Sequence, residues 1–222
     1  MTLDFYHLIP YAPALAWGFV LTVLAWAASL VLSLIVGSVL GLVAALTRGP
    51  VRMAIAAYVG FFRGTPLLIQ LFILYYGGPH LGLTLDAWQA GLLGLTLYGG
   101  AYATEIVRGG LQAIPRGQIE AARALGYTRW KTLRHIVTPQ VLVPVMPPMT
   151  NNAIFLLKDT ALLSVITVPE MTSQVSKMNI ETFTFVEPYL ALSITYWILV
   201  EFAARMGRLI EARITRHLEV RS

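Results

Sequence analysis

Long runs of apolar residues, separated by short polar or basic segments, dominate this chain. The first run, 15–46, contains no charged residue, and a membrane-spanning helix needs about 20 apolar residues. Further apolar runs cover about 53–76, 87–107, 139–157 and 189–204. The pattern predicts an all-α membrane protein with five transmembrane helices.

Helix-interrupting and small residues add detail to these runs. The fourth run contains Pro144, Pro147 and Pro148, and we expect it to bend because proline removes a backbone donor. Residues 161–187 mix a short apolar stretch with polar residues, and we expect them to be partly re-entrant and partly external. Small residues suited to close helix packing recur in the first run at Ser29, Ser33, Gly37, Ser38 and Gly41.

The composition supports membrane insertion. Charged residues make up 12% of the chain and mean hydropathy is +0.69, whereas a soluble domain has about 25% charged residues. We expect one domain, residues 1–222, whose first apolar run directs insertion without a cleaved signal peptide. The chain has no cysteine, which excludes disulfides, thiolate metal sites and cysteine catalysis.

The positive charges predict the orientation. Lys and Arg gather in the 48–52 turn, the 108–135 loop and the C-terminal tail, while the 77–86 loop has none and 159–187 has only Lys177. Positively charged loops favour the cytoplasmic side, so we expect the N-terminus outside and the C-terminus inside. The basic charge then fits a lipid bilayer, and we expect no nucleic-acid partner.

One polar island, about 108–138, separates the third and fourth apolar runs. Its residues 120–125 favour a helix, Gly126 can end that helix in a left-handed conformation, and 127–136 fits a second short helix with apolar residues along one face. It contains no nucleophile–base pair and no set of metal ligands. It is typical of a docking surface or, alternatively, of an amphipathic helix pair at the membrane surface.

Charged or helix-breaking residues at membrane depth are functional candidates. In Arg63-Gly64-Thr65-Pro66, Thr65 could cap a new helix and Pro66 could occupy its first position. Free N–H groups there would suit a carboxylate. The alternative is a simple kink.

Two acidic residues are further candidates. Glu105 could bind a substrate amine or pair with Arg108 one turn away. Asp159, next to Thr160, could bind an amine or pair with Arg63. Asn151 and Asn152 are typical of hydrogen bonding between helices.

The spacing of the polar island resembles the signature of permease subunits of bacterial ATP-binding-cassette importers. The matching positions are Glu120, Ala121, Ala122, Gly126, Ile136 and Pro139. Segments 58–77, 101–110, 117–126 and 151–160 resemble the polar amino-acid branch, typified by histidine, glutamine and arginine permeases. The resemblance covers nearly the whole chain.

The resemblance implies a multi-pass subunit in the bacterial cytoplasmic (inner) membrane. Its 108–138 loop would couple to a cytoplasmic ATPase through Glu120, Ala121, Ala122 and Gly126. Its partners would be two ATP-binding-cassette ATPase subunits, a second permease as homodimer or heterodimer, and an extracytoplasmic amino-acid-binding protein. Substrate would pass residues Arg63, Gly64, Thr65, Pro66, Glu105, Asp159 and Thr160.

The chain lacks a phosphate-binding loop of the form Gly-x-x-x-x-Gly-Lys-[Ser/Thr]. We therefore expect no cofactor and no enzymatic activity in this chain, with ATP and Mg²⁺ bound by the partner ATPase. The competing functions are a secondary transporter working alone and a membrane-embedded enzyme. No hydrolase or metalloprotease motif supports the enzyme.

Overall fold

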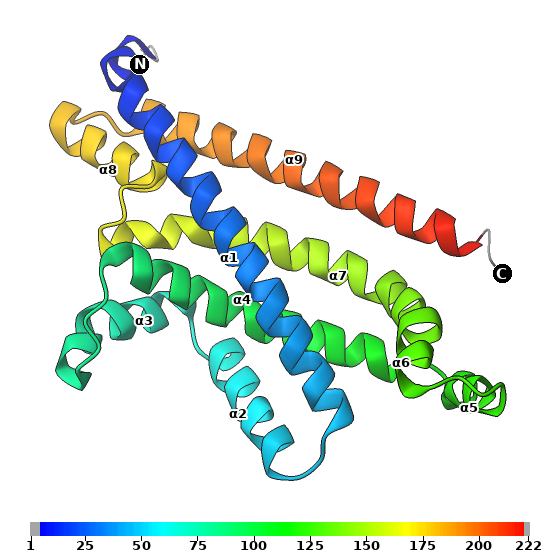
Figure 1. Ribbon diagram of the computed structural model, residues 1–222. Helices are drawn as coiled ribbons and strands as arrows, with labels where there is room; N and C mark the ends of the chain where they lie inside the picture. Colours follow the sequence, from blue (N-terminus) through cyan, green and yellow to red (C-terminus); the bar gives the residue numbers. More distant parts are fainter. Residues whose placement is uncertain (1–4, 220–222) are drawn as a thin grey trace.

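The computed structural model describes residues 5–219, and every regular element among them is a helix (Figure 1). The α-helices are α1 Ala12–Leu46, α2 Pro50–Gly64, α3 Leu67–Phe72, α4 Ala87–Gln112, α5 Arg116–Ala124, α6 Arg129–Thr132, α7 Thr138–Asp159, α8 Met171–Thr182 and α9 Val186–Glu219. Shorter 3₁₀ or π turns are η1 Phe5–Tyr11, η2 Ile73–Gly77, η3 Gly78–Leu81, η4 Leu133–Val137 and η5 Thr160–Ile166. The all-α prediction is confirmed.

Two helical stretches of the described chain, Leu8–Leu46 and Val186–Ile214, are both long and apolar enough to span a membrane. Pro50–Gly64 and Leu67–Leu81 qualify only together and are bent by 104°. Helices α4 and α7 have 26 and 22 residues, so at about 1.5 Å per residue each is also long enough to cross. The number of spans therefore stays a prediction.

Small residues bring α1 and α4 into close contact. Ser29, Ser33, Gly37 and Gly41 are all buried, and a Cβ added to Gly41 would lie 2.8 Å from the Thr104 carbonyl oxygen. The Ser33 hydroxyl donates across the contact to the carbonyl of Thr96 at 3.2 Å. The predicted packing stripe is confirmed for these positions and wrong for Ser38, which is exposed because it follows Gly37 by 100° around the helix.

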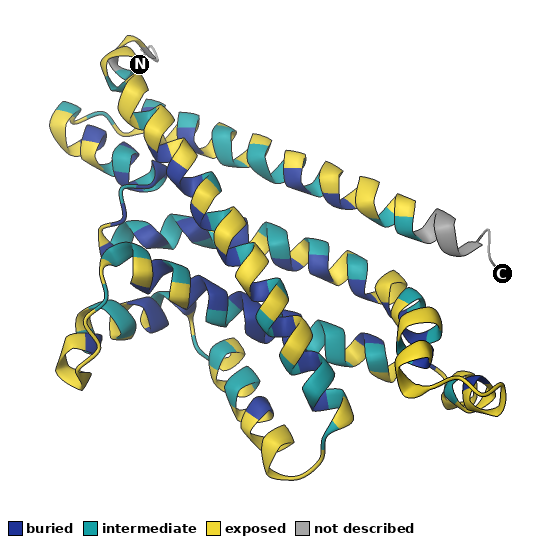
Figure 2. Cartoon of the chain, in the orientation of Figure 1, coloured by how far each residue is buried: buried dark blue, intermediate teal, exposed yellow. Residues whose placement is uncertain are grey.

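Helices α4 and α7 occupy the middle of the molecule, with α1 against α4 and α9 against α7 (Figures 1 and 2). Asn152 on α7 donates to the carbonyl of Gly99 on α4 at 3.2 Å, which confirms its predicted role in joining helices. Asn151 is exposed. The three internal prolines do not end α7, which continues to Asp159.

The segment after α7 is packed into the bundle before it emerges. Leu163, Ile166 and Val168 are fully buried in the main core, and α8 follows beside the start of α1 (Figure 1). The Tyr11 hydroxyl, at the end of η1, donates to a carboxylate oxygen of Glu181 on α8 at 2.8 Å and so joins η1 to α8.

Helix α9 continues without a break from the last apolar run into the basic tail. There Glu201 pairs with Arg205 and Arg208. The tail residue Arg221 lies outside the described residues.

Candidate functional site

The chain breaks between α2 and α3 at the predicted tetrapeptide. The Thr65 hydroxyl donates back to the Phe61 carbonyl of α2 at 2.8 Å, and Pro66, without a side-chain cap, is the N-cap of α3. The expected cap by Thr65, with Pro66 as the first helical residue, is therefore wrong.

Gln70, a residue that the sequence interpretation missed, stabilises this break. It is 7% exposed, and its amide nitrogen lies 2.9 Å from the Phe62 carbonyl and 2.7 Å from the Thr65 hydroxyl. Its own carbonyl oxygen has no partner among the described residues. A lone amide in an otherwise apolar run was the available signal, since such a group needs hydrogen bonds when buried.

A hollow of about 330 Å³ lies between α4 and α7. Its lining residues are Tyr98, Tyr102, Asn152, Phe155, Leu156 and Asp159. The hydroxyl oxygens of Tyr98 and Tyr102 are 3.4 Å apart, and the guanidinium of Arg63 lies 4.9 Å from the centre of the Tyr102 ring. The hollow thus combines aromatic walls, an amide, a carboxylate and a nearby cation, which suits a small polar ligand.

The two acidic candidates occupy different surroundings. Glu105 forms an ion pair with Arg108, with Arg108 Nε donating at 2.9 Å, and Glu105 does not line the hollow. Asp159 does line it, and no ion pair joins Asp159 to Arg63 among the described residues. Of the open alternatives, the structure contains the Glu105–Arg108 pair and lacks the Asp159–Arg63 pair.

Thr160 is turned away from the hollow. It is fully buried, and its hydroxyl donates to the Leu157 carbonyl at 2.6 Å. The same hydroxyl lies 3.4 Å from that of Tyr196 on α9. Thr160 is thus part of the packing that holds α7 against α9.

Glu170 is a second residue that the sequence interpretation missed. It is fully buried and caps α8, accepting hydrogen bonds from the backbone of Thr172 at 2.9 Å and Ser173 at 2.8 Å. The hydroxyls of Thr22 and Tyr196 each donate to it at 3.4 Å. Glu170 therefore ties α8 to α1 and α9, and the sequence signal was an acidic residue directly before a helix.

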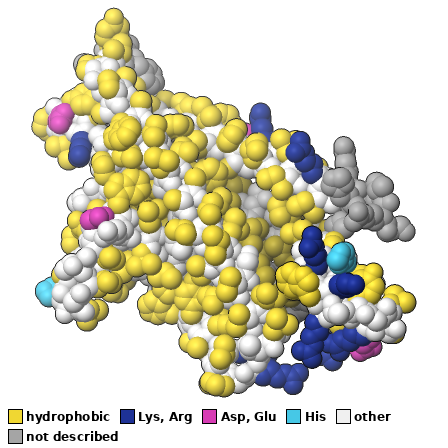
Figure 3. Space-filling model, viewed as in Figure 1, with side chains coloured by type: hydrophobic (Ala, Val, Ile, Leu, Met, Phe, Trp, Pro, Cys, Tyr) yellow, Lys and Arg dark blue, Asp and Glu magenta, His cyan; other side chains and the backbone are white. Residues whose placement is uncertain are grey.

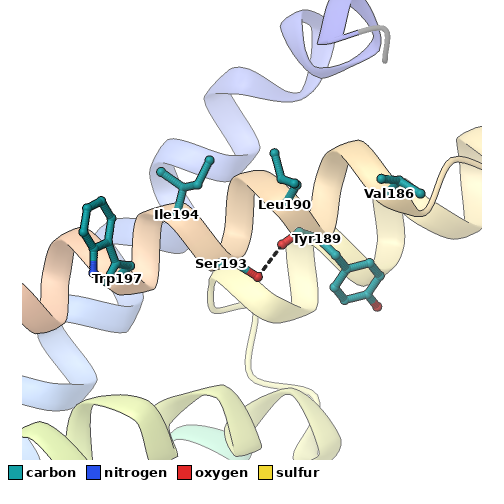
Figure 4. Close-up of a pocket in the computed structure, with 6 residues that line it drawn as sticks. All are labelled: Val186, Tyr189, Leu190, Ser193, Ile194 and Trp197. Carbon is teal, nitrogen blue, oxygen red and sulfur yellow. Dashed lines mark hydrogen bonds between the residues drawn. The ribbon is translucent and has the colours of Figure 1, made fainter. Parts of the chain in front are cut away.

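A second hollow, on the outer face of α9, lacks this chemistry (Figure 4). Its lining residues all come from one helix: Val186, Tyr189, Leu190, Ser193, Ile194 and Trp197. The Ser193 hydroxyl donates to the Tyr189 carbonyl of its own helix at 2.8 Å. This apolar face is suited to contact with lipid.

The polar island folds as two short helices with a left-handed glycine between them. Gly126 has φ +77°, its N–H donates to the Arg123 carbonyl at 2.9 Å, and the Tyr127 N–H donates to the Ala122 carbonyl at 3.0 Å. These two bonds form a Schellman motif, so the predicted glycine turn is confirmed. The second helix starts at a Thr128 cap and continues as the π turn η4 instead of forming one regular helix.

The first of these helices, α5, has two distinct faces. Ala122 is 4% exposed, while Glu120 and Ala121 are exposed. Lys and Arg side chains gather at this end of the molecule, around α5, α6 and the turn between α1 and α2 (Figure 3). Within residues 5–219, no three His, Asp or Glu side chains converge as metal ligands.

The sequence is similar to those of known permeases. It is 34% identical to the arginine transport system permease protein ArtQ of Bacillus subtilis, over 96% of this chain and 98% of that one. It is 36% identical to the L-cystine transport system permease protein TcyB of the same organism, over 85% of this chain and 82% of that one.

Solved structures share the fold. One, described as an amino acid ABC transporter with histidines, matches with a TM-score of 0.87 and 31% identity over 96% of this chain and 100% of that one. The MetNI methionine ABC transporter matches with a TM-score of 0.79 at 22% identity, a likeness of fold alone. Residues 37–216 match the family described as the binding-protein-dependent transport system inner membrane component. The chain belongs to that family of ATP-binding-cassette importer permeases.

Proposed function

We propose that this chain is the membrane-spanning subunit of an ATP-driven importer of polar amino acids in the bacterial inner membrane. The observation that carries the proposal is the similarity over 96% of the chain to an arginine permease. A cystine permease and a probable glutamine permease of Bacillus subtilis are also similar to this chain. Neither competing function, a lone secondary transporter or a membrane enzyme, has comparable support.

The chain crosses the membrane five times in this proposal. The spans are α1, the bent pair α2 and α3, α4, α7 and α9. The basic end that carries α5 and α6 faces the cytoplasm, and α8 lies outside. The asymmetry of Lys and Arg along the chain supports this orientation.

The hollow between α4 and α7 is the proposed site for substrate on its pathway. Asp159 binds the amine, and the guanidinium of Arg63, held over Tyr102, attracts the carboxylate. A charge in the bundle is stabilised when the substrate supplies the opposite one. In this proposal Glu105 remains paired with Arg108 and does not bind substrate. Thr160 positions α7 against α9. The break between α2 and α3, formed by Gly64, Thr65 and Pro66, positions Arg63. Because the substrate amine occupies the one carboxylate that lines the hollow, the site has no second acid that would favour amino acids with a cationic side chain.

Asp159→Asn tests this site because it keeps the size of the side chain and removes its charge. A hydrogen bond to a charged group contributes about 1.5–3 kcal/mol, so we expect the uptake affinity to fall by about tenfold or more. Glu105→Gln is the matched control and should change uptake by less than about fivefold, since a partly exposed ion pair contributes about 0–1 kcal/mol. Normal uptake by Asp159→Asn would remove the carboxylate from the pathway.

The exposed face of α5 is the proposed docking surface for the ATPase. Glu120 and Ala121 face the partner, Ala122 anchors the helix against the membrane domain, and Gly126 sets the turn that follows. ATP and Mg²⁺ bind to the partner. A second permease subunit and an external amino-acid-binding protein complete the importer.

Copurification tests the partnership. An affinity-tagged chain expressed with the ATPase of its own organism should retain that ATPase through gel filtration. The chain recovered alone under conditions in which related importers stay intact would favour the lone secondary transporter.

A further inference from the structure

A third cavity, unrelated to the substrate hollow and to the hollow on α9, lies at the basic end of the molecule. Its volume is about 650 Å³, and it is bounded by the last turns of α1 and α4 and by α5, α6 and η4. Its apolar walls include Leu42, Leu46, Leu111 and Ile119, and its cationic side chains are Arg123 and Arg129.

The two arginines are available for a ligand. Both are exposed, and neither guanidinium forms a hydrogen bond or ion pair among residues 5–219. No Asp or Glu of that part of the chain lines the cavity. Two unpaired guanidiniums beside an aliphatic wall suit an anion that carries an apolar chain, because guanidinium binds phosphate oxygens in pairs.

The position of the cavity identifies the source of such an anion. Leu46, the last residue of α1, is 74% exposed, and Val39 and Ile35 above it are each 55% exposed. The cavity therefore opens along an apolar surface of α1. Trp130, which also lines the cavity, is 68% exposed, and tryptophan favours the boundary between headgroups and hydrocarbon.

Only part of the proposed docking face of α5 points away from the cavity. Ile119 and Arg123 are one turn apart and line the cavity together. By the 3.6-residue period of the helix, Ala121 lies on the side opposite both of them, and Glu120 lies between the two sides. The cavity is thus on the membrane side of α5, where a lipid can reach it.

We propose that this cavity binds an anionic phospholipid. The phosphate contacts Arg123 and Arg129, and an acyl chain lies along Leu42 and Leu46. Basic pockets between membrane helices on the cytoplasmic side bind anionic headgroups in this way. The inference goes beyond the proposed transport function and requires only that this end of the chain lies at a membrane surface.

Native mass spectrometry of the detergent-purified full chain tests the proposal, with dioleoyl phosphatidylglycerol and dioleoyl phosphatidylcholine as probes. We expect tighter binding of phosphatidylglycerol. Arg123→Gln with Arg129→Gln should weaken it by about thirtyfold, the effect of removing two charges near an anionic headgroup. Lys131→Gln with Arg134→Gln is the control, because it removes the same charge from exposed positions that do not line the cavity.

Three results would overturn the proposal. Equal losses of phosphatidylglycerol affinity in both double variants would mean that the basic surface attracts the lipid diffusely, without a defined site. Equal binding of the two lipids would mean an apolar groove that does not recognise phosphate. Inorganic phosphate that displaces the lipid fully at millimolar concentration would mean a site for free anions. If the double Gln variant does not fold, Arg123→Lys with Arg129→Lys should keep the preference for phosphatidylglycerol, and its loss would also contradict the proposal.

Discussion

Gly126 offers a perturbation whose effect comes from the backbone alone. It has φ +77°, and a Cβ added there would meet nothing within 4 Å. A substitution therefore acts only by disfavouring the left-handed conformation that lets Tyr127 and Gly126 close the end of α5. Gly117, on the same helix, has equally open space and no positive φ, so it is the matched control.

The expected magnitude follows from the cost of that conformation. A left-handed residue with a Cβ costs about 1–2 kcal/mol relative to glycine, and a β-branched residue costs more. If the ATPase binds only the closed turn, its apparent affinity falls by about 5- to 30-fold for Gly126→Ala and further for Gly126→Val. Asparagine tolerates this conformation, so Gly126→Asn should stay near the wild type.

The assay compares ATPase affinity and substrate-stimulated ATP hydrolysis in reconstituted membranes. We expect the order Gly, Asn, Ala, Val at position 126, with Val losing stimulation while the subunit still inserts. Gly117→Val should have a much smaller effect. Coupled transport unchanged in Gly126→Val, or lost equally in Gly117→Val, would refute the assignment of this turn to coupling.

Three further predictions concern packing and topology. Gly37→Ala should lower stability by about 1–3 kcal/mol, since its Cβ would come within 2.8–2.9 Å of the α4 backbone at Ala103 and Thr104. Gly60→Ala, in open space, is the control and should be neutral by thermal melting. Equal melting temperatures for the two variants would contradict the close contact between α1 and α4. Glu170→Ala should cost about 2–3 kcal/mol through the lost cap and the unpaired buried donors, against less than about 1 kcal/mol for the exposed Glu181→Ala; a smaller loss at Glu170 than at Glu181 would disprove its anchoring role. An impermeant thiol reagent on intact cells should label Thr84→Cys and not Gly117→Cys, both exposed, and the reverse pattern would invert the proposed topology.

Local sequence features predicted the local structure well. Small residues at helical spacing identified the α1 face that meets α4, and a glycine after a run of helix formers identified the Schellman turn. Both depend on residues a few positions apart. Ser38 lies outside this face because it follows Gly37 by 100° around the helix.

Contacts between distant residues were not predictable from the same features. Thr22 and Glu170 meet across 148 positions, and Tyr196 joins them from α9. Likewise, Arg63 lies over the Tyr102 ring and does not pair with Asp159. This arrangement depends on how α2 lies against α4. The break is stabilised by Gln70, and not by a Thr65 cap on the next helix. The Gln70 amide donates to the carbonyl and hydroxyl oxygens of Thr65, and these contacts depend on the angle between α2 and α3.

Substrate-stimulated ATP hydrolysis tests the central claim most directly. The chain would be reconstituted with its ATPase and its binding protein in proteoliposomes, and ATP hydrolysis would be measured with each polar amino acid in turn. The proposal predicts that at least one amino acid raises the rate and accumulates inside, and that Gly126→Val abolishes the increase. Uptake that continues without ATP or ATPase would contradict the claim and identify a transporter that works alone.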